Sequence, residues 1–464
     1  MLFLALPQLY LLPEGSIDIA LTTIVTALLL PAVSVGVKRS PDRRLFGLGL
    51  FRVLVALLAV RLLALVWSPE PRAGLQSIVL LGQFIVTLML MWEAVRQDPD
   101  LLRHVQRVYW PWVALEAGLV ILFRVQPAVE AMFLRSIGGV FIGENTIADF
   151  FGDKPNNVFD VAKSGGVFIN ANVAAMFLGV SGLAALAVAS VTHTRWVRLV
   201  GIAALVSVPF TGSKSATILA LALPAIAFGV TRMNRAATVV RRHPLILAGS
   251  LGMAVVLLLY AANRGLLVAL SEALLGRTVM WGFGAKSFQD TPILGLGYGG
   301  WDAGFTPYAA DYGLHRSFPP HNLLLAAWSS TGIPGLVLTV IFFALAFWLF
   351  VRGLSRRFTC DKSFVSYAGA AVGWILIQGM GENTDIFGEI HLIPIVSLLI
   401  AYLIRNLGEE LKESATHAHR RHRATPAIPA VGDVHRQPGV GTAQLPPAVR
   451  GEGPGPDHAR GRLG

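Results

Sequence analysis

Charged side chains are scarce in this chain. Asp, Glu, Lys and Arg make up 14% of its 464 residues, whereas a soluble domain carries about 25%. Hydrophobic residues reach 54%, and the mean hydropathy is +0.61. This composition, spread over many long apolar runs, excludes an ordinary soluble fold. It predicts an all-α polytopic membrane protein, because a helix satisfies its own backbone hydrogen bonds in lipid.

Cysteine is almost absent as well. Cys360 is the single cysteine of the chain, so no internal disulfide is possible. No cluster of Cys and His suggests a zinc site, and we expect neither a metal ion nor a cofactor. Met1 to Leu12 is apolar but has no basic n-region and no convincing cleavage site, so we expect no cleavable signal peptide.

Long apolar stretches divide the chain into candidate membrane spans. Each has close to the ~20 residues that cross the hydrocarbon core, or slightly fewer. They cover roughly residues 17–37, 45–67, 74–95, 108–124, 167–190, 196–212, 215–231, 244–262, 322–351, 364–382 and 388–404. We therefore expect about 11 to 12 transmembrane helices. They form one integral membrane domain, residues 1–408, with a large extracytoplasmic loop at 263–321.

The basic residues account for the net charge of +11 without a nucleic-acid partner. They lie in every second loop between the candidate spans and in the C-terminal segment, which is the pattern of cytoplasmic loops. The C-terminus is therefore expected in the cytoplasm. The loops 125–166, 211–214, 263–321 and 381–389 are expected on the opposite face, and they hold the rarer polar residues.

The composition changes in the last segment, residues 409–464. It is rich in Pro, Gly, His and Arg and almost lacks aromatic residues. Such a segment cannot bury a core, so we expect a disordered, basic, cytoplasmic tail. Its His-rich start could bind a metal ion, but we interpret it as part of the solvated basic tail.

Two cations of the outer face, Lys214 and Arg277, are candidates for binding an anion. Lys214 follows Ser213 in FTGSKSATI, where a helix N-terminus and the ammonium would point at the same anion. A lysine that snorkels to the interface explains the position equally well. Arg277 can form two parallel hydrogen bonds to phosphate, and a salt bridge to Glu272 is the alternative.

His321 in FPPHN stands directly before an apolar stretch, with Asn322 beside it. Because histidine titrates near neutral pH, His321 is the best candidate for a general base. The following helix should kink or re-enter the membrane at TGIPG, residues 331–335. The glycines of ILGLGYGGW, residues 293–301, are interpreted as tight turns and not as a nucleotide-binding loop.

Further polar residues lie on the same predicted face. Asn170 and Asn172 begin a span and could bind substrate or satisfy the backbone. Glu382 and Asp385 could be counter-ions of the cations or a second base. Arg316, in the large loop, is a further candidate for substrate binding.

These motifs, in this order, resemble the O-antigen ligase and O-antigen polymerase superfamily. The similarity is close over about residues 160–350, and the motifs are FINAN, TGSKSA, GRTVMW, the F-x-x-x-P-x-x-G-x-G pattern from Phe288 to Gly297, HNLLL and GIPG. Two positions depart from the family pattern. Lys214 stands where arginine is common, and Ala171 stands where proline is common.

The resemblance implies a GT-C-like fold and a metal-independent, inverting glycosyl transfer in a bacterial cytoplasmic membrane. The donor would be a polyprenyl-pyrophosphate-linked glycan, and the acceptor a sugar hydroxyl on a lipid or glycan. Lys214 and Arg277 would hold the pyrophosphate at the extracytoplasmic face. His321 would activate the acceptor hydroxyl.

The sequence leaves several functions open. Ligase and polymerase use the same donor group and differ in the acceptor. A membrane transporter of a small molecule or a lipid-linked glycan is the rival class, and Arg52 and Arg61 in the second span would mark its pathway. A structural scaffold would tolerate substitution of Lys214, Arg277 and His321.

Overall fold

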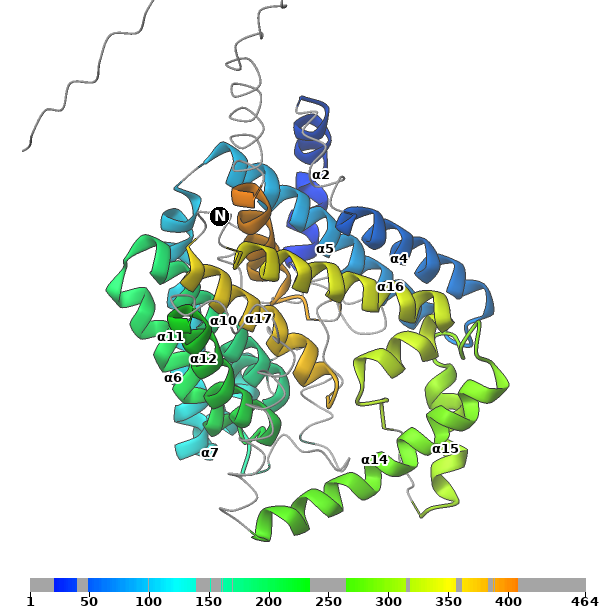
Figure 1. The fold of residues 1–464 in the computed structure, drawn as a ribbon. Coiled ribbons are helices and arrows are strands. Elements are labelled where there is room, and N and C mark those ends of the chain that lie inside the picture. Colours follow the sequence, from blue (N-terminus) through cyan, green and yellow to red (C-terminus); the bar gives the residue numbers. More distant parts are fainter. Residues whose placement is uncertain are drawn as a thin grey trace, which may run out of the picture. The chain divides into compact units, whose positions relative to one another are not determined.

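We describe the protein from a computed structural model, shown in Figure 1. It describes residues 21–39, 49–98, 100–138, 151, 160, 162–168, 170–233, 264–313, 318–355, 361–382, 387 and 389–407. All regular structure in these ranges is helical, which confirms the all-α prediction. The expected span at 244–262 and the expected tail lie outside the described residues.

The helices follow the predicted apolar stretches closely. They are α2 (Leu21–Arg39), α4 (Leu50–Ala64) with η1 (Leu65–Trp67), α5 (Pro71–Gln97), α6 (Leu101–Val125), α7 (Pro127–Phe133), η2 (Leu134–Gly138), η3 (Gly166–Phe168), α10 (Ala171–Thr192), α11 (Arg195–Ser207), η4 (Val208–Thr211), α12 (Lys214–Met233), α14 (Arg264–Asp290), α15 (Gly300–Ala310), α16 (Leu323–Gly353) and α17 (Lys362–Gly379). A further helix, Ile393–Leu407, is called the last helix below.

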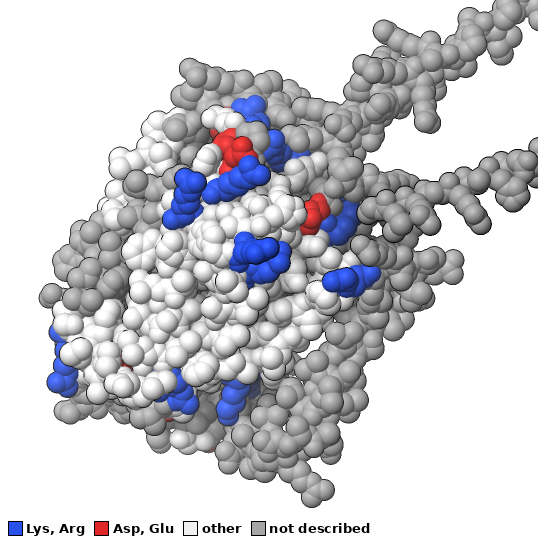
Figure 2. Space-filling view, turned by 90° about the vertical axis from the view of Figure 1, so that its left-hand side faces the viewer, with Lys and Arg blue, Asp and Glu red and all other residues white. Residues whose placement is uncertain are grey.

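Six of the described helices are long and apolar enough to cross a membrane. They are α4 with η1, α5, α6, α10, α12 and α16, and the last helix is a shorter apolar helix. This agrees with a polytopic membrane protein, and the total of about 11 to 12 spans stays a prediction. Figure 2 shows one face on which a broad uncharged region separates Lys and Arg side chains above it from others below it.

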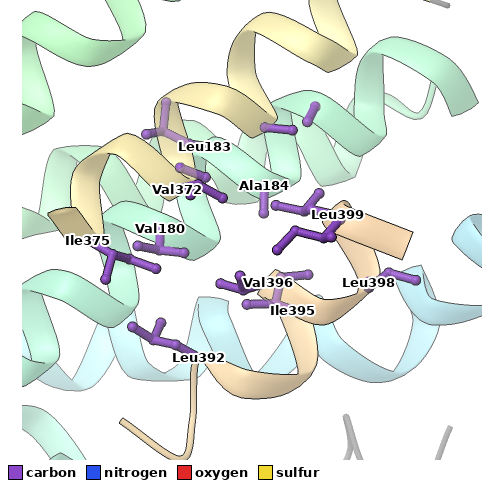
Figure 3. Close-up of a cluster of buried hydrophobic side chains, with 14 of the residues drawn as sticks. Val180, Leu183, Ala184, Val372, Ile375, Leu392, Ile395, Val396, Leu398 and Leu399 are labelled. Atoms are coloured by element: carbon purple, nitrogen blue, oxygen red, sulfur yellow. The ribbon is translucent and has the colours of Figure 1, made fainter. Parts of the chain in front are cut away.

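Two groups of helices pack around shared neighbours (Figure 1). In one, α10 packs on α11, α17 and α6; in the other, α16 packs on α4, and α4 on α5. Contacts between α16 and α17 join the two groups. Figure 3 shows how side chains of α10, α17 and the last helix converge, with Val180, Val372 and Val396 among them.

Small residues let α10 approach its neighbours closely. A Cβ at Gly179 would collide with the Trp374 ring of α17, and one at Gly182 would meet the backbone of Gly201 in α11. Lipid gives helices no hydrophobic reason to associate, so close packing at small residues is what holds them together. This packing fixes α10 and α17, whose ends carry the polar site described below.

The predicted outer loop is more helical than its composition suggests. It contains all of α14 and α15, which share a small aromatic core of Phe283, Trp301 and Phe305. The Trp301 indole N–H also donates to the Phe318 carbonyl at 2.8 Å. Between the two helices Gly295, Gly297 and Gly299 all have positive φ, which confirms the predicted turns.

The predicted kink of α16 occurs at Gly332, whose φ is 71° and ψ −167°. A Cβ there would collide with the backbone of Ile293. The interruption frees backbone groups that bind the preceding loop: Ile333 N–H donates to Ile293 O at 3.1 Å, and Leu296 N–H donates to Ser329 O at 2.7 Å. The kink thus anchors the outer loop on the start of α16.

Candidate functional site

The carboxylate of Glu382 connects three separate elements. Asn172 of α10 donates from Nδ2 to Glu382 Oε2 at 2.8 Å. Arg277 of α14 places Nη2 at 3.6 Å from Glu382 Oε1, and the same Nη2 donates to the Gly381 carbonyl at 2.8 Å. His321 Nδ1 lies 3.8 Å from Glu382 Oε2. We call Asn172, Arg277, His321 and Glu382 the Glu382 cluster.

The neighbours of the Glu382 cluster hold its members in place. Asn170 caps α10, accepting from the N–H of Asn172 and of Val173. Near the end of α17, the Gln378 side-chain amide donates to the Asn172 carbonyl at 2.9 Å. The Gln378 side-chain oxygen accepts from the Trp374 indole N–H at 2.6 Å. These bonds join the start of α10 to the end of α17, so the Asn172–Glu382 contact has a rigid base.

His321 stands at the entrance of α16 with an unusual backbone. Its φ is 44°, a left-handed value that few residues other than glycine adopt, and such backbones gather at functional sites. Asn322 caps the helix through Oδ1, which accepts from Leu324 N and Leu325 N at 2.9 and 3.0 Å. Burial, and then the charge of Arg277, lower the pKa of His321. The imidazole is therefore neutral at pH 7 and can accept a proton.

The pKa of Glu382 is shifted in the opposite direction. Burial raises the pKa of its carboxyl, and the charges of Arg277 and Lys163 partly counteract that increase. Lys163 is a cation that the sequence analysis missed. It precedes the FINAN motif and pairs loosely with Asp160 at 3.6 Å. It could have been found only by asking which basic residues share the predicted outer face with Glu382.

Lys214 is the first residue of α12, as predicted for a cation at a helix N-terminus. Its side chain is exposed, and it makes no ion pair with the described members of the Glu382 cluster. Backbone contacts bring its turn to the Lys163 segment: Ser164 N–H donates to Thr211 O at 3.1 Å. A Cβ at Gly212 would collide with the Ala162 carbonyl, so this approach requires glycine. Ser213 is buried beside it.

Arg316 and Asp385 lie outside the described residues, so their predicted roles stay predictions, and the Glu272 side chain, the alternative partner of Arg277, is not described either. Asn322 Nδ2 donates to the Met380 carbonyl at 3.4 Å, two residues before Glu382. Glu382 is the counter-ion of Arg277, which is one of the two roles predicted for it.

Comparison with known proteins supports the resemblance seen in the motifs. Residues 199–340 match the family model described as O-Antigen ligase. This range contains Lys214, Arg277 and His321, and it leaves Asn172 and Glu382 outside. The helices and this match define the class: a polytopic membrane protein with an O-antigen ligase-like region.

A curated relative extends the comparison. Over 193 residues the chain is 28% identical to the exopolysaccharide production protein ExoQ of Rhizobium meliloti (strain 1021). The match covers 39% of this chain and 43% of the relative, so less than half of either protein is aligned.

Proposed function

We propose that this protein transfers a glycan from a polyprenyl-pyrophosphate donor to an acceptor hydroxyl at the extracytoplasmic face of a bacterial membrane. The observation that carries the proposal is the Glu382 cluster, in which the Glu382 carboxylate faces both a neutral His321 and the Arg277 cation. The O-antigen ligase match around Arg277 and His321 supports the same reaction class.

The donor is held by the cations. Arg277, Lys163 and Lys214 offer positive charge around one region of the outer face, and the first two act on the same carboxylate. As the bond between the anomeric carbon and the pyrophosphate breaks, negative charge grows on the leaving oxygen. Fixed cations stabilise that charge without reorganising. In this proposal they take the role that a metal ion has in many other transferases.

The acceptor is activated by His321. The acceptor oxygen forms its bond to the anomeric carbon on the face opposite the leaving pyrophosphate, which inverts that centre. Its proton passes to the free ring nitrogen of His321. Glu382, 3.8 Å from Nδ1, orients the ring and stabilises the imidazolium that forms. In this proposal the gap closes to hydrogen-bond distance when substrate binds, as catalytic hydrogen bonds that are long in the free enzyme often do.

The experiment is reconstitution of the full chain with a polyprenyl-pyrophosphate oligosaccharide and candidate acceptors, with EDTA and without ATP. We expect a new glycosidic product by mass spectrometry from wild type and from His193→Ala, and none from His321→Ala. His193 is a matched control because it also has a positive φ, of 55°, but follows the opposite end of α10. Product from His321→Ala would refute the base assignment.

The alternative form of this transfer is polymerisation, which is compatible with the name of the curated relative, an exopolysaccharide production protein. In that case the acceptor is itself a lipid-linked glycan, and the product mass rises by whole repeat units. A product joined once to a different lipid identifies a ligase. Movement of intact donor across the membrane without any covalent product would refute transfer and support a transporter.

A further inference from the structure

A charged residue lies inside the apolar helix α4. The Arg61 side chain is 9% exposed, and an arginine at such a place in a membrane protein is costly and usually functional. Its Nη1 donates to Ser77 O at 3.0 Å and to Ser77 Oγ at 2.7 Å. The guanidinium lies 5.2 Å from the Phe387 ring centroid. Within the described part of the chain no carboxylate forms an ion pair with it.

Arg61 lines a cavity of about 90 Å³. Its polar lining comes from α4, α5, α16 and the turn before α15, and consists of Arg61, Ser77, Tyr298, Ser330, Thr331 and Thr339. A polar cavity of this size holds several waters or one tetrahedral oxyanion, since one water needs only about 10–15 Å³ of such volume. The positive charge favours the anion.

The free donors of this cavity suit a phosphate group. Arginine has five N–H donors, and the bonds to Ser77 use Nη1 alone. The Tyr298 hydroxyl is buried near Ser77 but makes no hydrogen bond of good geometry to a described residue. Thr331 and Thr339 instead donate to carbonyls of their own helix, at 2.6 and 2.8 Å. A guanidinium fork with a nearby hydroxyl is a typical phosphate-binding arrangement.

The backbone fixes the Tyr298 side of the cavity before any ligand arrives. Tyr298 N–H donates to Ser68 Oγ at 2.8 Å, and Glu70 N–H donates to Tyr298 O at 2.9 Å. Gly74 makes room for the Tyr298 ring, with which a Cβ would collide. A site built in this way binds without a large ordering cost.

The Arg61 cavity adjoins the Glu382 cluster. Leu323 lines the cavity and is separated from His321 only by Asn322. The chain therefore has two sets of cations: Arg277 with Lys163 at the Glu382 cluster, and Arg61 in a cavity that reaches the start of α16. We propose that the Arg61 cavity binds the phosphate group of the second substrate, so that the acceptor too is a phosphate-bearing lipid. The identification of the bound lipid as the acceptor rests on the proposed function. The phosphate site itself rests on the cavity alone.

The test measures lipid binding by native mass spectrometry of the full chain in detergent. The probes are phosphatidic acid and diacylglycerol with the same acyl chains, which differ only in the phosphate. We expect wild type to retain phosphatidic acid and not diacylglycerol, and Arg61→Gln to bind phosphatidic acid at least about tenfold more weakly, because charge-assisted bonds are lost. Arg52→Gln is the matched control, since Arg52 lies on the same helix and is exposed.

A second variant separates binding from folding. Tyr298→Phe removes a hydroxyl that lies near Ser77 but makes no well-formed hydrogen bond to a described residue. It should weaken phosphatidic acid binding several-fold and change the melting temperature little. Equal binding by wild type, Arg61→Gln and Tyr298→Phe would overturn the site. Adding inorganic phosphate identifies the source: full competition at millimolar concentration assigns the cavity to a free anion and overturns the lipid acceptor.

His321→Ala distinguishes this proposal from the proposed function. It should retain phosphatidic acid while losing transfer. If wild type shows no transfer but still loses phosphatidic acid binding through Arg61→Gln, the phosphate site stands and the transferase is refuted. If wild type shows transfer but Arg61→Gln binds phosphatidic acid as well as wild type does, the transferase stands and the phosphate site is refuted.

Discussion

At the scale of single residues, the protonation of His321 decides whether the base can act. Its pKa is lowered by burial and by the charge of Arg277, so the neutral form persists below the ordinary value of about 6.5. We predict that kcat/KM stays high as pH falls to 6.5 and decreases only below it. In Arg277→Gln one cause of the lowering is gone, and the acidic limb should move to higher pH. An unmoved limb would show that the two residues are not coupled.

The same shift has a consequence for stability. The folded-state pKa of His321 lies below that of the unfolded chain, so protons bind preferentially to the unfolded state. The contribution of this residue is intact above pH about 6.5 and decreases as pH falls below that value. The acidic limb should therefore be measured together with the melting temperature, so that loss of rate is separated from loss of fold.

Glu382 offers a second prediction at this scale. Glu382→Gln keeps an oxygen that can accept from Asn172 but removes the charge that faces Arg277 and His321. We expect kcat to fall more than tenfold, yet less than in His321→Ala, because the base itself remains. Donor KM should change little if Glu382 acts through His321. Asp290→Asn, an exposed acid at the end of α14, is the control and should be silent.

At the scale of elements, the kink of α16 supports both cavity and cluster. Gly332→Ala forces a side chain into a positive φ and against the Ile293 backbone. We expect a loss of about 1–3 kcal/mol from the backbone conformation alone, measured as a lower melting temperature by fluorescence-detected size exclusion. Gly82→Ala in α5, where a Cβ meets nothing within 4 Å, should leave stability unchanged or raise it by up to about 1 kcal/mol. Equal melting temperatures for both variants would contradict this role.

The helices and turns also show which structural features can be predicted from the sequence. The kink followed from TGIPG and the turns from the glycines of the outer loop, because both are local backbone preferences. The helices α14 and α15 within that loop were not predicted, since their stability comes from an aromatic core between them and not from a 20-residue apolar run. The Asn172–Glu382 bond joins residues 210 apart. No local pattern specifies such a contact, and for the same reason Lys163 was overlooked.

At the scale of the whole chain, the hydrophobic stretches predicted the helices well. The expected span 74–95 is α5, Pro71–Gln97, and the expected 322–351 is α16, Leu323–Gly353. Hydropathy succeeds here because each span must be apolar by itself. Orientation is a different quantity. It depends on which loops carry Lys and Arg, and the helix packing alone does not fix which face is outside.

Cysteine labelling tests that orientation directly, because the chain has a single natural cysteine, Cys360. Cys360 belongs to a basic loop predicted to be cytoplasmic, so wild type in right-side-out vesicles should resist a membrane-impermeant maleimide. The variant Cys360→Ser with Tyr312→Cys should react at once, since Tyr312 is 59% exposed and follows α15 on the predicted outer face. Both proteins should label fully once detergent opens the vesicles. Labelling of Cys360 in closed vesicles would invert the topology, place the Glu382 cluster in the cytoplasm, and remove the basis for a donor presented at the outer face.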